Sequence, residues 1–117
     1  MKVLQSVANR AEVHILFPGK RHTHKVGRVS GTHTPIKERG VSRQHSILVN
    51  LEGDNILAVD MGSTNGTSVN GKKLEIADEV EVKPEDTIKF ASLAYRYRLM
   101  DKLPRKPIDR SDKTELL

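Results

Sequence analysis

The chain is built from short apolar runs that end at Gly, Pro, Asn or Asp residues, and this punctuation limits the folds open to it. The runs 46–51 and 55–60, for example, are separated only by Glu52-Gly53-Asp54. No window of helical length carries an apolar stripe with the helical period. Many short runs between turn residues are typical of an all-β sandwich or barrel. The sequence therefore predicts an all-β fold with little or no helix.

We expect about ten short strands in a single domain that spans residues 1–100. A chain of 117 residues can close one hydrophobic core but not two. Residues 29–41 contain Gly and Pro without an apolar period, so a long loop is expected there. Residues 101–117 mix charges with proline and are expected to form a flexible charged tail or linker. The expected strands are 12–17, 24–28, 46–51, 55–60, 67–69, 72–76, 79–82, 86–91 and 94–100.

The composition argues against disulfide, thiol and membrane chemistry. The chain has no cysteine, a pattern that fits a reducing compartment. No uninterrupted apolar run is long enough for a membrane span or a signal peptide. We therefore expect a soluble intracellular protein without membrane partners.

The positive charge is concentrated in one part of the chain. The formal net charge is +5. Residues 18–49 carry seven basic residues against one acid, whereas residues 50–99 carry nine acids and six bases. A nucleic-acid binder more often presents a basic stripe or helix, so we consider nucleic-acid binding unlikely. The segment 18–49 is either a solvated surface or part of a site for an anion.

Three loops of this chain combine glycine with hydrogen-bond donors. They are Gly27-Arg28, residues 40–45 (GVSRQH) and residues 62–67 (GSTNGT). Asn-Gly pairs favour tight turns, and the pair in 62–67 is followed closely by a second, Asn70-Gly71. Arginine, hydroxyl groups and free backbone N–H groups are the donors that a phosphate group prefers. The second pair is expected to form a structural hairpin, and the first to belong to a binding loop.

The three loops resemble the motifs of the forkhead-associated (FHA) domain family, in the family's order. Gly27-Arg28 comes first, Ser42-Arg43-Gln44-His45 fits its S-x-x-H pattern, and Ser63-Thr64-Asn65-Gly66-Thr67 follows. The resemblance covers about residues 12–100. It implies a two-sheet β-sandwich of about 10–11 short strands that binds phosphothreonine peptides and is not an enzyme.

The resemblance also implies a role for individual residues. Arg28, Ser42 and Thr64 are expected to contact the phosphate, together with Arg43 beside Ser42. Asn65 is expected to hold the main chain of the bound peptide. Three further residues are expected to be structural: Gly27, His45 and Gly66.

The residues favour neither a hydrolase triad nor a metal site. Ser42, His45 and Asp60 could be taken for a hydrolase triad, but the chain lacks the G-x-S-x-G elbow that would expose such a serine. The histidines of the N-terminal part have no cysteine and no suitable carboxylate beside them, so no metal site is expected. They are His14, His22, His24 and His33. The sequence indicates no cofactor.

The expected function is that of a phosphothreonine-dependent interaction module. Family analogy points to an adaptor in nuclear signalling, such as the DNA-damage response or chromatin regulation. An alternative is a self-associating module, in which a homodimer binds phosphothreonine of a second copy. Thr114 and Thr23 are the candidate residues for such a contact.

Overall fold

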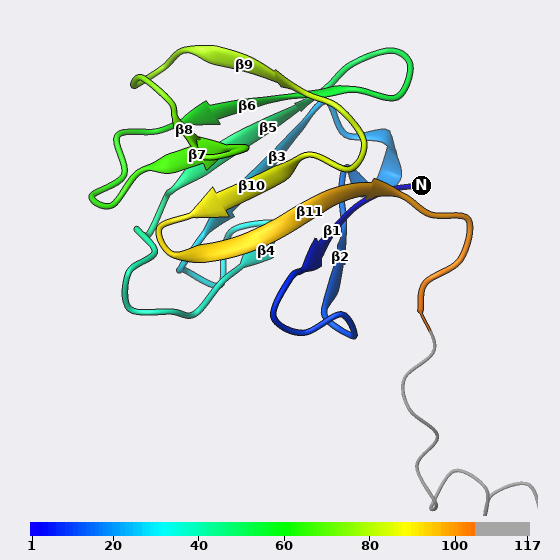
Figure 1. Ribbon diagram of the computed structural model, residues 1–117, viewed down its shortest axis with the longest axis horizontal. Coiled ribbons are helices and arrows are strands. Elements are labelled where there is room, and N and C mark those ends of the chain that lie inside the picture. The colour runs from blue at the N-terminus through cyan, green and yellow to red at the C-terminus, as the bar shows by residue number, and fades with distance from the viewer. Residues whose placement is uncertain (105–117) are drawn as a thin grey trace, which may run out of the picture.

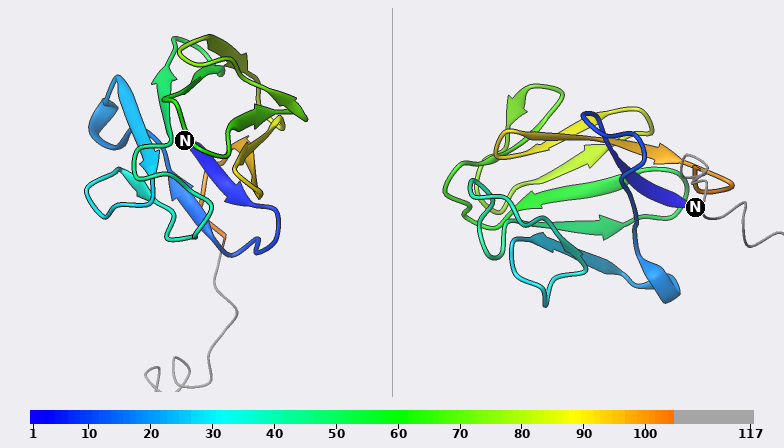
Figure 2. Two further views of the ribbon diagram at one scale, coloured as in Figure 1. Left: turned by 90° about the vertical axis from the view of Figure 1, so that its left-hand side faces the viewer. Right: turned by 90° about the horizontal axis from the view of Figure 1, so that it is seen from below.

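The computed structural model describes residues 1–104, which form a sandwich of two β-sheets (Figure 1). Figure 2 shows the two layers from two further sides. The expected all-β fold and the two-sheet sandwich are confirmed. Within the described part of the chain, the helical structure is the short 3-10 turn Pro18–Lys20. No helix in that part has the length and hydropathy needed to cross a membrane.

Each sheet joins strands that are distant in the sequence. The six-stranded sheet contains, in spatial order, β2 (Val13–Ile15), β1 (Lys2–Ser6), β11 (Leu93–Leu99), β10 (Thr87–Phe90), β7 (Thr67–Val69) and β8 (Lys72–Lys73). The five-stranded sheet contains β4 (Thr34–Pro35), β3 (Thr23–Gly27), β5 (Ser46–Asn50), β6 (Ile56–Asp60) and β9 (Glu79–Val82). All pairs are antiparallel except β3 with β4.

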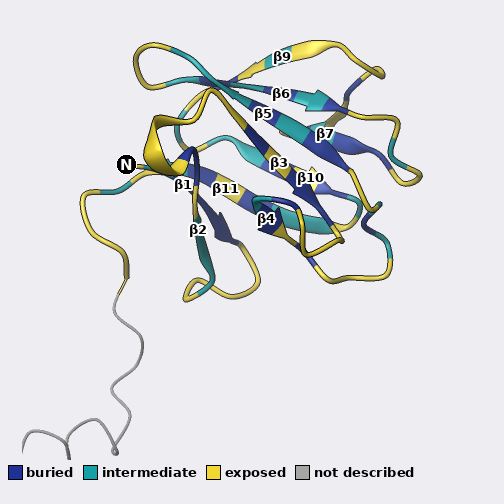
Figure 3. Ribbon diagram, turned by 180° about the vertical axis from the view of Figure 1, so that it is seen from behind, coloured by how far each residue is buried: buried dark blue, intermediate teal, exposed yellow. Residues whose placement is uncertain are grey.

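The core lies between the sheets and follows from the two-residue period of the strands. On β11, Tyr95 and Tyr97 are buried, whereas Arg96 between them is exposed (Figure 3). Leu4 lies opposite Tyr97 in the β1–β11 register and is also fully buried. Aliphatic side chains from the other sheet, among them Leu48, complete the same cluster. The chain therefore closes its core with aliphatic residues and few aromatic rings.

The N-terminal region differs from the expectation. Strand β1 was not predicted, and it pairs with both β2 and β11 near one end of the sheet. The predicted strand 12–17 is reduced to Val13–Ile15. Alternation along 12–17 would place Ile15 on the same face as Phe17, but Phe17 is buried and Ile15 is 42% exposed. Phe17 has φ 54°, a left-handed conformation that turns the chain into Pro18–Lys20. This turn ends the alternation that the sequence suggested.

Two other predicted boundaries differ from the structure. The predicted strand 72–76 ends at Lys73, although Ile76 still forms a single bridge to Asp60. The predicted loop 29–41 contains the two-residue strand β4, which runs parallel to β3. The second Asn-Gly pair links β7 to β8, with Asn70 at φ 50° and Gly71 at φ 85°. That hairpin is as expected. The tail predicted for 101–117 lies mostly outside the described residues.

The first and last strands bring distant parts of the chain together. The amino group of Met1 donates to the carbonyl oxygen of Met100 at 2.6 Å, and the Met100 N–H donates to the Met1 carbonyl at 2.9 Å. The N-terminus lies at the right-hand end of the sandwich in Figure 1, and these bonds place Met100 beside it.

A buried histidine ties β3 both to strand β4 and to the residue before the 3-10 turn. His24 is fully buried; its Nδ1 accepts from the Phe17 N–H at 3.1 Å, and its Nε2 lies 2.6 Å from Thr34 Oγ1. Burial, together with the nearby His33, His14 and Arg21, lowers the pKa of His24 to about 4. The imidazole is therefore neutral in the folded protein near neutral pH.

This histidine should make stability depend on pH. Between pH 6.5 and 4 the unfolded chain binds a proton that folded His24 does not, so stability should fall as pH is lowered through this window. The loss should approach about 3 kcal/mol. Urea unfolding at pH 7.5 and 4.5 measures it. His24→Gln should reduce the difference, and the exposed control His22→Gln should not; equal pH dependence in all three proteins would contradict the assignment.

Candidate functional site

The strand register places the three glycine-containing loops at one end of the sandwich. Val26 near the end of β3 lies opposite Ser46 at the start of β5, and Ser46 lies opposite Asp60 at the end of β6. Because β5 lies between β3 and β6 and runs antiparallel to both, the end of β3, the start of β5 and the end of β6 lie at the same edge. Residues 27–28, 40–45 and 61–67 therefore emerge there together. In Figure 1 they gather at the left-hand end, away from Met1.

Hydrogen bonds join the first two loops directly. The Arg28 N–H donates to the Ser42 carbonyl at 2.9 Å, and Arg28 Nε donates to the Val41 carbonyl, also at 2.9 Å. The guanidinium is thereby held against the loop that carries Ser42. Its Nη1 and Nη2 groups make no hydrogen bond with any of residues 1–104. Arg28 is exposed, so these groups remain available to a ligand.

The third loop is bonded to the second. The Thr64 N–H donates to Ser42 Oγ at 3.0 Å, and Asn65 Nδ2 donates to the Gly40 carbonyl at 2.8 Å. Thr64 and Asn65 are both exposed. Ser42 Oγ accepts one bond in this contact and keeps its own O–H to donate. The structure thus brings together Arg28, Ser42 and Thr64, the residues that the sequence predicts for the phosphate.

His45 lies beneath these loops and holds two of them. It is fully buried; its Nδ1 accepts from the Ser42 N–H at 3.0 Å, and its Nε2 lies 2.8 Å from the Gly66 carbonyl oxygen. A carbonyl can only accept, so Nε2 carries the proton and the neutral imidazole has both nitrogens paired. The main-chain N–H of His45 also donates to the Val26 carbonyl at 3.0 Å. One side chain therefore positions the Ser42 and Gly66 segments together.

Asp60 organises the third loop, a role that sequence reasoning missed. Its Oδ2 accepts from the Gly62 and Ser63 N–H groups, each at 3.1 Å, and its Oδ1 accepts from Ser63 Oγ at 2.6 Å and Thr67 Oγ1 at 2.7 Å. Burial acts to raise the pKa of this carboxyl, but the four donors lower it below its usual value. Ser63 Oγ also accepts from the Gly66 N–H. The position of Asp60 directly before a Ser-Thr-Asn-Gly turn was the available signal.

Two glycines allow the close approach of these segments. A Cβ on Gly27 would lie 2.0 Å from the main-chain oxygen of Arg43, which leaves no room for a side chain. Gly66 has φ +86°, and a Cβ there would lie 2.7 Å from Cε of Lys73. The stem of Lys73 thus covers the Asn65-Gly66 turn, a neighbour that sequence reasoning did not identify.

Ser42, His45 and Asp60 do not form the hydrogen-bond series of a hydrolase triad. His45 is paired with the main chain of Ser42, whereas the hydroxyl of Ser42 contacts Thr64. Asp60 accepts from four donors of its own loop, and His45 is not one of them. These contacts do not connect a serine hydroxyl, an imidazole and a carboxylate in series. Within residues 1–104, no group of three His, Cys, Asp or Glu residues is arranged to hold a metal ion.

Comparison with known proteins gives a family and a fold. The model of the FHA domain family matches residues 24–91, which include all three loops. No curated protein sequence matches the chain.

Solved structures with the same architecture come from several organisms. The FHA domain of an Arabidopsis thaliana hypothetical protein superposes with a TM-score of 0.73 at 26% identity, over 91% of this chain and 90% of that one. The N-terminal FHA domain of Saccharomyces cerevisiae Rad53p, in complex with a phosphothreonine peptide, superposes with a TM-score of 0.69 at 20% identity, over 86% of this chain and 94% of that one. Mycobacterium tuberculosis EmbR, in complex with a low-affinity phosphopeptide, superposes with a TM-score of 0.70 at 21% identity. The match covers 83% of this chain but only 24% of the EmbR chain.

The close contact at Gly27 yields a stability prediction. Gly27→Ala should lower the free energy of unfolding by about 1–3 kcal/mol, because the Arg43 main chain must move away from the new methyl group. Gly31→Ala is the matched control, since a Cβ there meets nothing within 4 Å. Urea unfolding of both variants measures the effect. Equal stability of the two would show that the loops are not held as closely as described.

Proposed function

Because the chain belongs to the FHA domain family, we propose that it binds phosphothreonine-containing proteins or peptides at the three-loop site. The observation that carries the proposal is the direct bonding of the Arg28, Ser42 and Thr64 segments at one exposed edge. Residues 39–45 and 61–67 contain no acid, so nothing on these two segments repels an anion.

The available donors suit the oxygens of a phosphate group. The guanidinium of Arg28 supplies charge and the terminal N–H groups that its contact with Val41 leaves over. Ser42 and Thr64 supply hydroxyl groups that can donate to two different oxygens. Arg43 is exposed beside Ser42 and adds a second positive charge. These groups are fixed before the ligand arrives, because the loops are already bonded to one another.

The magnitudes favour a phosphate-dependent but modest affinity. Hydrogen bonds to a charged group contribute about 1.5–3 kcal/mol each. Association costs roughly 4–15 kcal/mol in lost freedom, so three or four such bonds leave little net affinity without contacts to the flanking peptide. The phosphate then acts as the switch, and the flanking residues set the choice of partner.

Asn65 is the residue that we propose for the peptide main chain. Its Nδ2 donates to Gly40 in the free protein, which fixes the amide next to Thr64 and leaves Oδ1 to accept a peptide N–H. Through this contact Asn65 would set the register of the peptide relative to the phosphate.

We further propose that the protein acts as an interaction adaptor and not as an enzyme. A place in nuclear signalling rests on family analogy alone, and the similar structures come from a bacterium as well as from eukaryotes. The self-association alternative stays a prediction: Thr114 lies outside the described residues, and Thr23 is the first residue of β3.

A phosphopeptide array tests the proposed function. The wild-type protein should retain phosphothreonine peptides over phosphoserine and unmodified peptides. Arg28→Ala should reduce binding by about tenfold or more, because one charged donor is lost. Arg21→Ala is the control, since Arg21 is an exposed arginine of the same basic segment with no place among the three loops. Equal retention of phosphorylated and plain peptides would contradict the proposal.

The hydroxyl groups can be tested separately from folding. Ser42→Ala and Thr64→Ala should each weaken phosphopeptide binding several-fold in fluorescence anisotropy, because each loses one donor to the phosphate. Thermal unfolding of Thr64→Ala should match the wild type, because the contact of Thr64 with Ser42 uses its main-chain N–H. Unchanged affinity in both variants would remove these two residues from the site.

A further inference from the structure

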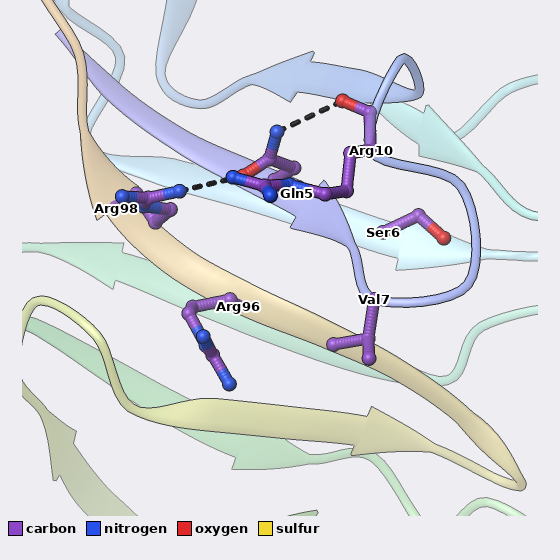
Figure 4. A pocket seen from close by; sticks show the side chains of 6 residues that line it. All are labelled: Gln5, Ser6, Val7, Arg10, Arg96 and Arg98. Carbon is purple, nitrogen blue, oxygen red and sulfur yellow. Dashed lines mark hydrogen bonds between the residues drawn. The ribbon is translucent and has the colours of Figure 1, made fainter.

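Three arginines surround a hollow on the outer face of the six-stranded sheet, away from the three-loop site. The hollow is lined by Gln5, Ser6, Val7, Arg10, Arg96 and Arg98 (Figure 4). Arg96 and Arg98 come from β11, and Arg10 from the loop that follows β1. Because Tyr95 and Tyr97 point into the core, the two arginines of β11 must point outward.

The floor of the hollow is a buried polar side chain that bonds to the side chain of Arg98 and to the main chain of Arg10. Gln5 is 6% exposed and lies directly opposite Arg96 in the β1–β11 register. Its Oε1 accepts from Arg98 Nη1 at 3.0 Å, and its Nε2 donates to the Arg10 carbonyl at 2.8 Å. Figure 4 shows Gln5 between these two residues. The fold therefore holds the guanidinium of Arg98 and the main chain of Arg10 against Gln5, and the strand register sets Arg96 opposite it.

The positive charge of this cluster is only partly compensated. Arg98 Nε pairs with the exposed carboxylate of Glu85 at 3.0 Å. The guanidinium groups of Arg10 and Arg96 form neither a hydrogen bond nor an ion pair with any residue from 1 to 104. Asp101 and Lys102 lie in the adjoining hollow, which Gln5, Arg10 and Arg98 also line. Three arginines and one lysine against the carboxylates of Glu85 and Asp101 leave a formal excess of two positive charges. A dianion matches that excess, and the guanidinium fork suits the oxygens of a phosphate.

We propose that this hollow, the Gln5 site, is a second anion site that binds a phosphate group carried by a protein partner. A peptide is favoured over single-stranded nucleic acid because both Phe and both Tyr residues of the chain are buried, so no aromatic surface is offered for base stacking. Val7, which is 50% exposed beside the arginines, offers an apolar contact for the flank of a peptide. The site would let the domain engage a second phosphorylated residue.

The first experiment isolates this site from the three-loop site. In the full chain carrying Arg28→Ala, inorganic phosphate is titrated at 150 mM salt, and amide NMR shifts are followed. Saturable shifts are expected at Gln5, Arg96 and Arg98. Adding Arg10→Ala and Arg96→Ala should weaken binding by about tenfold or more, as expected for the loss of two charged donors. Both side chains are unpaired in the described structure, so folding should be retained.

A matched control separates a built site from diffuse charge. Lys89 is an exposed cation of β10 on the same outward face, directly opposite Ala94. Lys89→Ala should change the phosphate affinity by no more than about twofold. An equal loss in the Lys89 and arginine variants, or no shifts at Gln5 and Arg96, would overturn the proposal.

A second experiment distinguishes the source of the phosphate. A blocked phosphoserine tripeptide should shift the same amides in the Arg28→Ala protein, and the unphosphorylated tripeptide should not. Duplex DNA and vesicles containing a phosphoinositide are tested in parallel. If these bind through Arg10 and Arg96 and the phosphopeptide does not, the assignment to a protein partner is wrong. Because Arg28 is absent throughout, the outcome does not depend on the proposed function of the three-loop site.

Discussion

The binding edge depends on one buried imidazole. His45 accepts a bond from the main chain of Ser42 and donates one to Gly66, which is 21 residues further along the chain, so it fixes the distance between the two loops. The bond to Gly66 is buried and the bond from Ser42 is partly buried. The ring also packs against Phe90 of the core, with ring centroids 5.9 Å apart, and Phe90 in turn packs against Tyr95 at 5.8 Å. The position of exposed donors is thereby set by the same packing that closes the sandwich. The loops need little reordering when a ligand binds.

The fold and the residues of the candidate site could be predicted from the sequence because both are marked by short local patterns. Asn-Gly pairs and short apolar runs specify turns and strands within a few residues, and the site residues lie directly beside those turns. Gly27 and Gly66 could be marked as structural for the same reason. The phosphate contacts themselves remain predictions, because the described contacts of Arg28, Ser42 and Thr64 are those of the free protein.

The parts that escaped prediction depend on contacts between distant segments. Val3, Leu4, Gln5 and Ser6 of β1 are all buried, so this strand shows no alternation of apolar and polar residues. Gln5 bonds to the side chain of Arg98 on β11 and to the main chain of Arg10 in the loop after β1. No short window of sequence reveals the contact with β11. The contacts of Asp60 form only when residues 61–67 fold back on it. The contact of Lys73 with Gly66 likewise depends on the pairing of β7 with β8.

The pairing of Met1 with Met100 separates the attachment points of the domain from its recognition edge. The first and last residues of the sandwich, Met1 and Met100, are adjacent. They lie at the opposite end of the sheets from the loops that carry Arg28 and Thr64. A short linker could therefore join the two ends, and the backbone could be reopened at the exposed Gly53 hairpin, to give a circularly permuted domain with the same strand pairing. Cargo joined directly at Met1 or at Met100 would likewise start on the side of the sandwich away from the three loops.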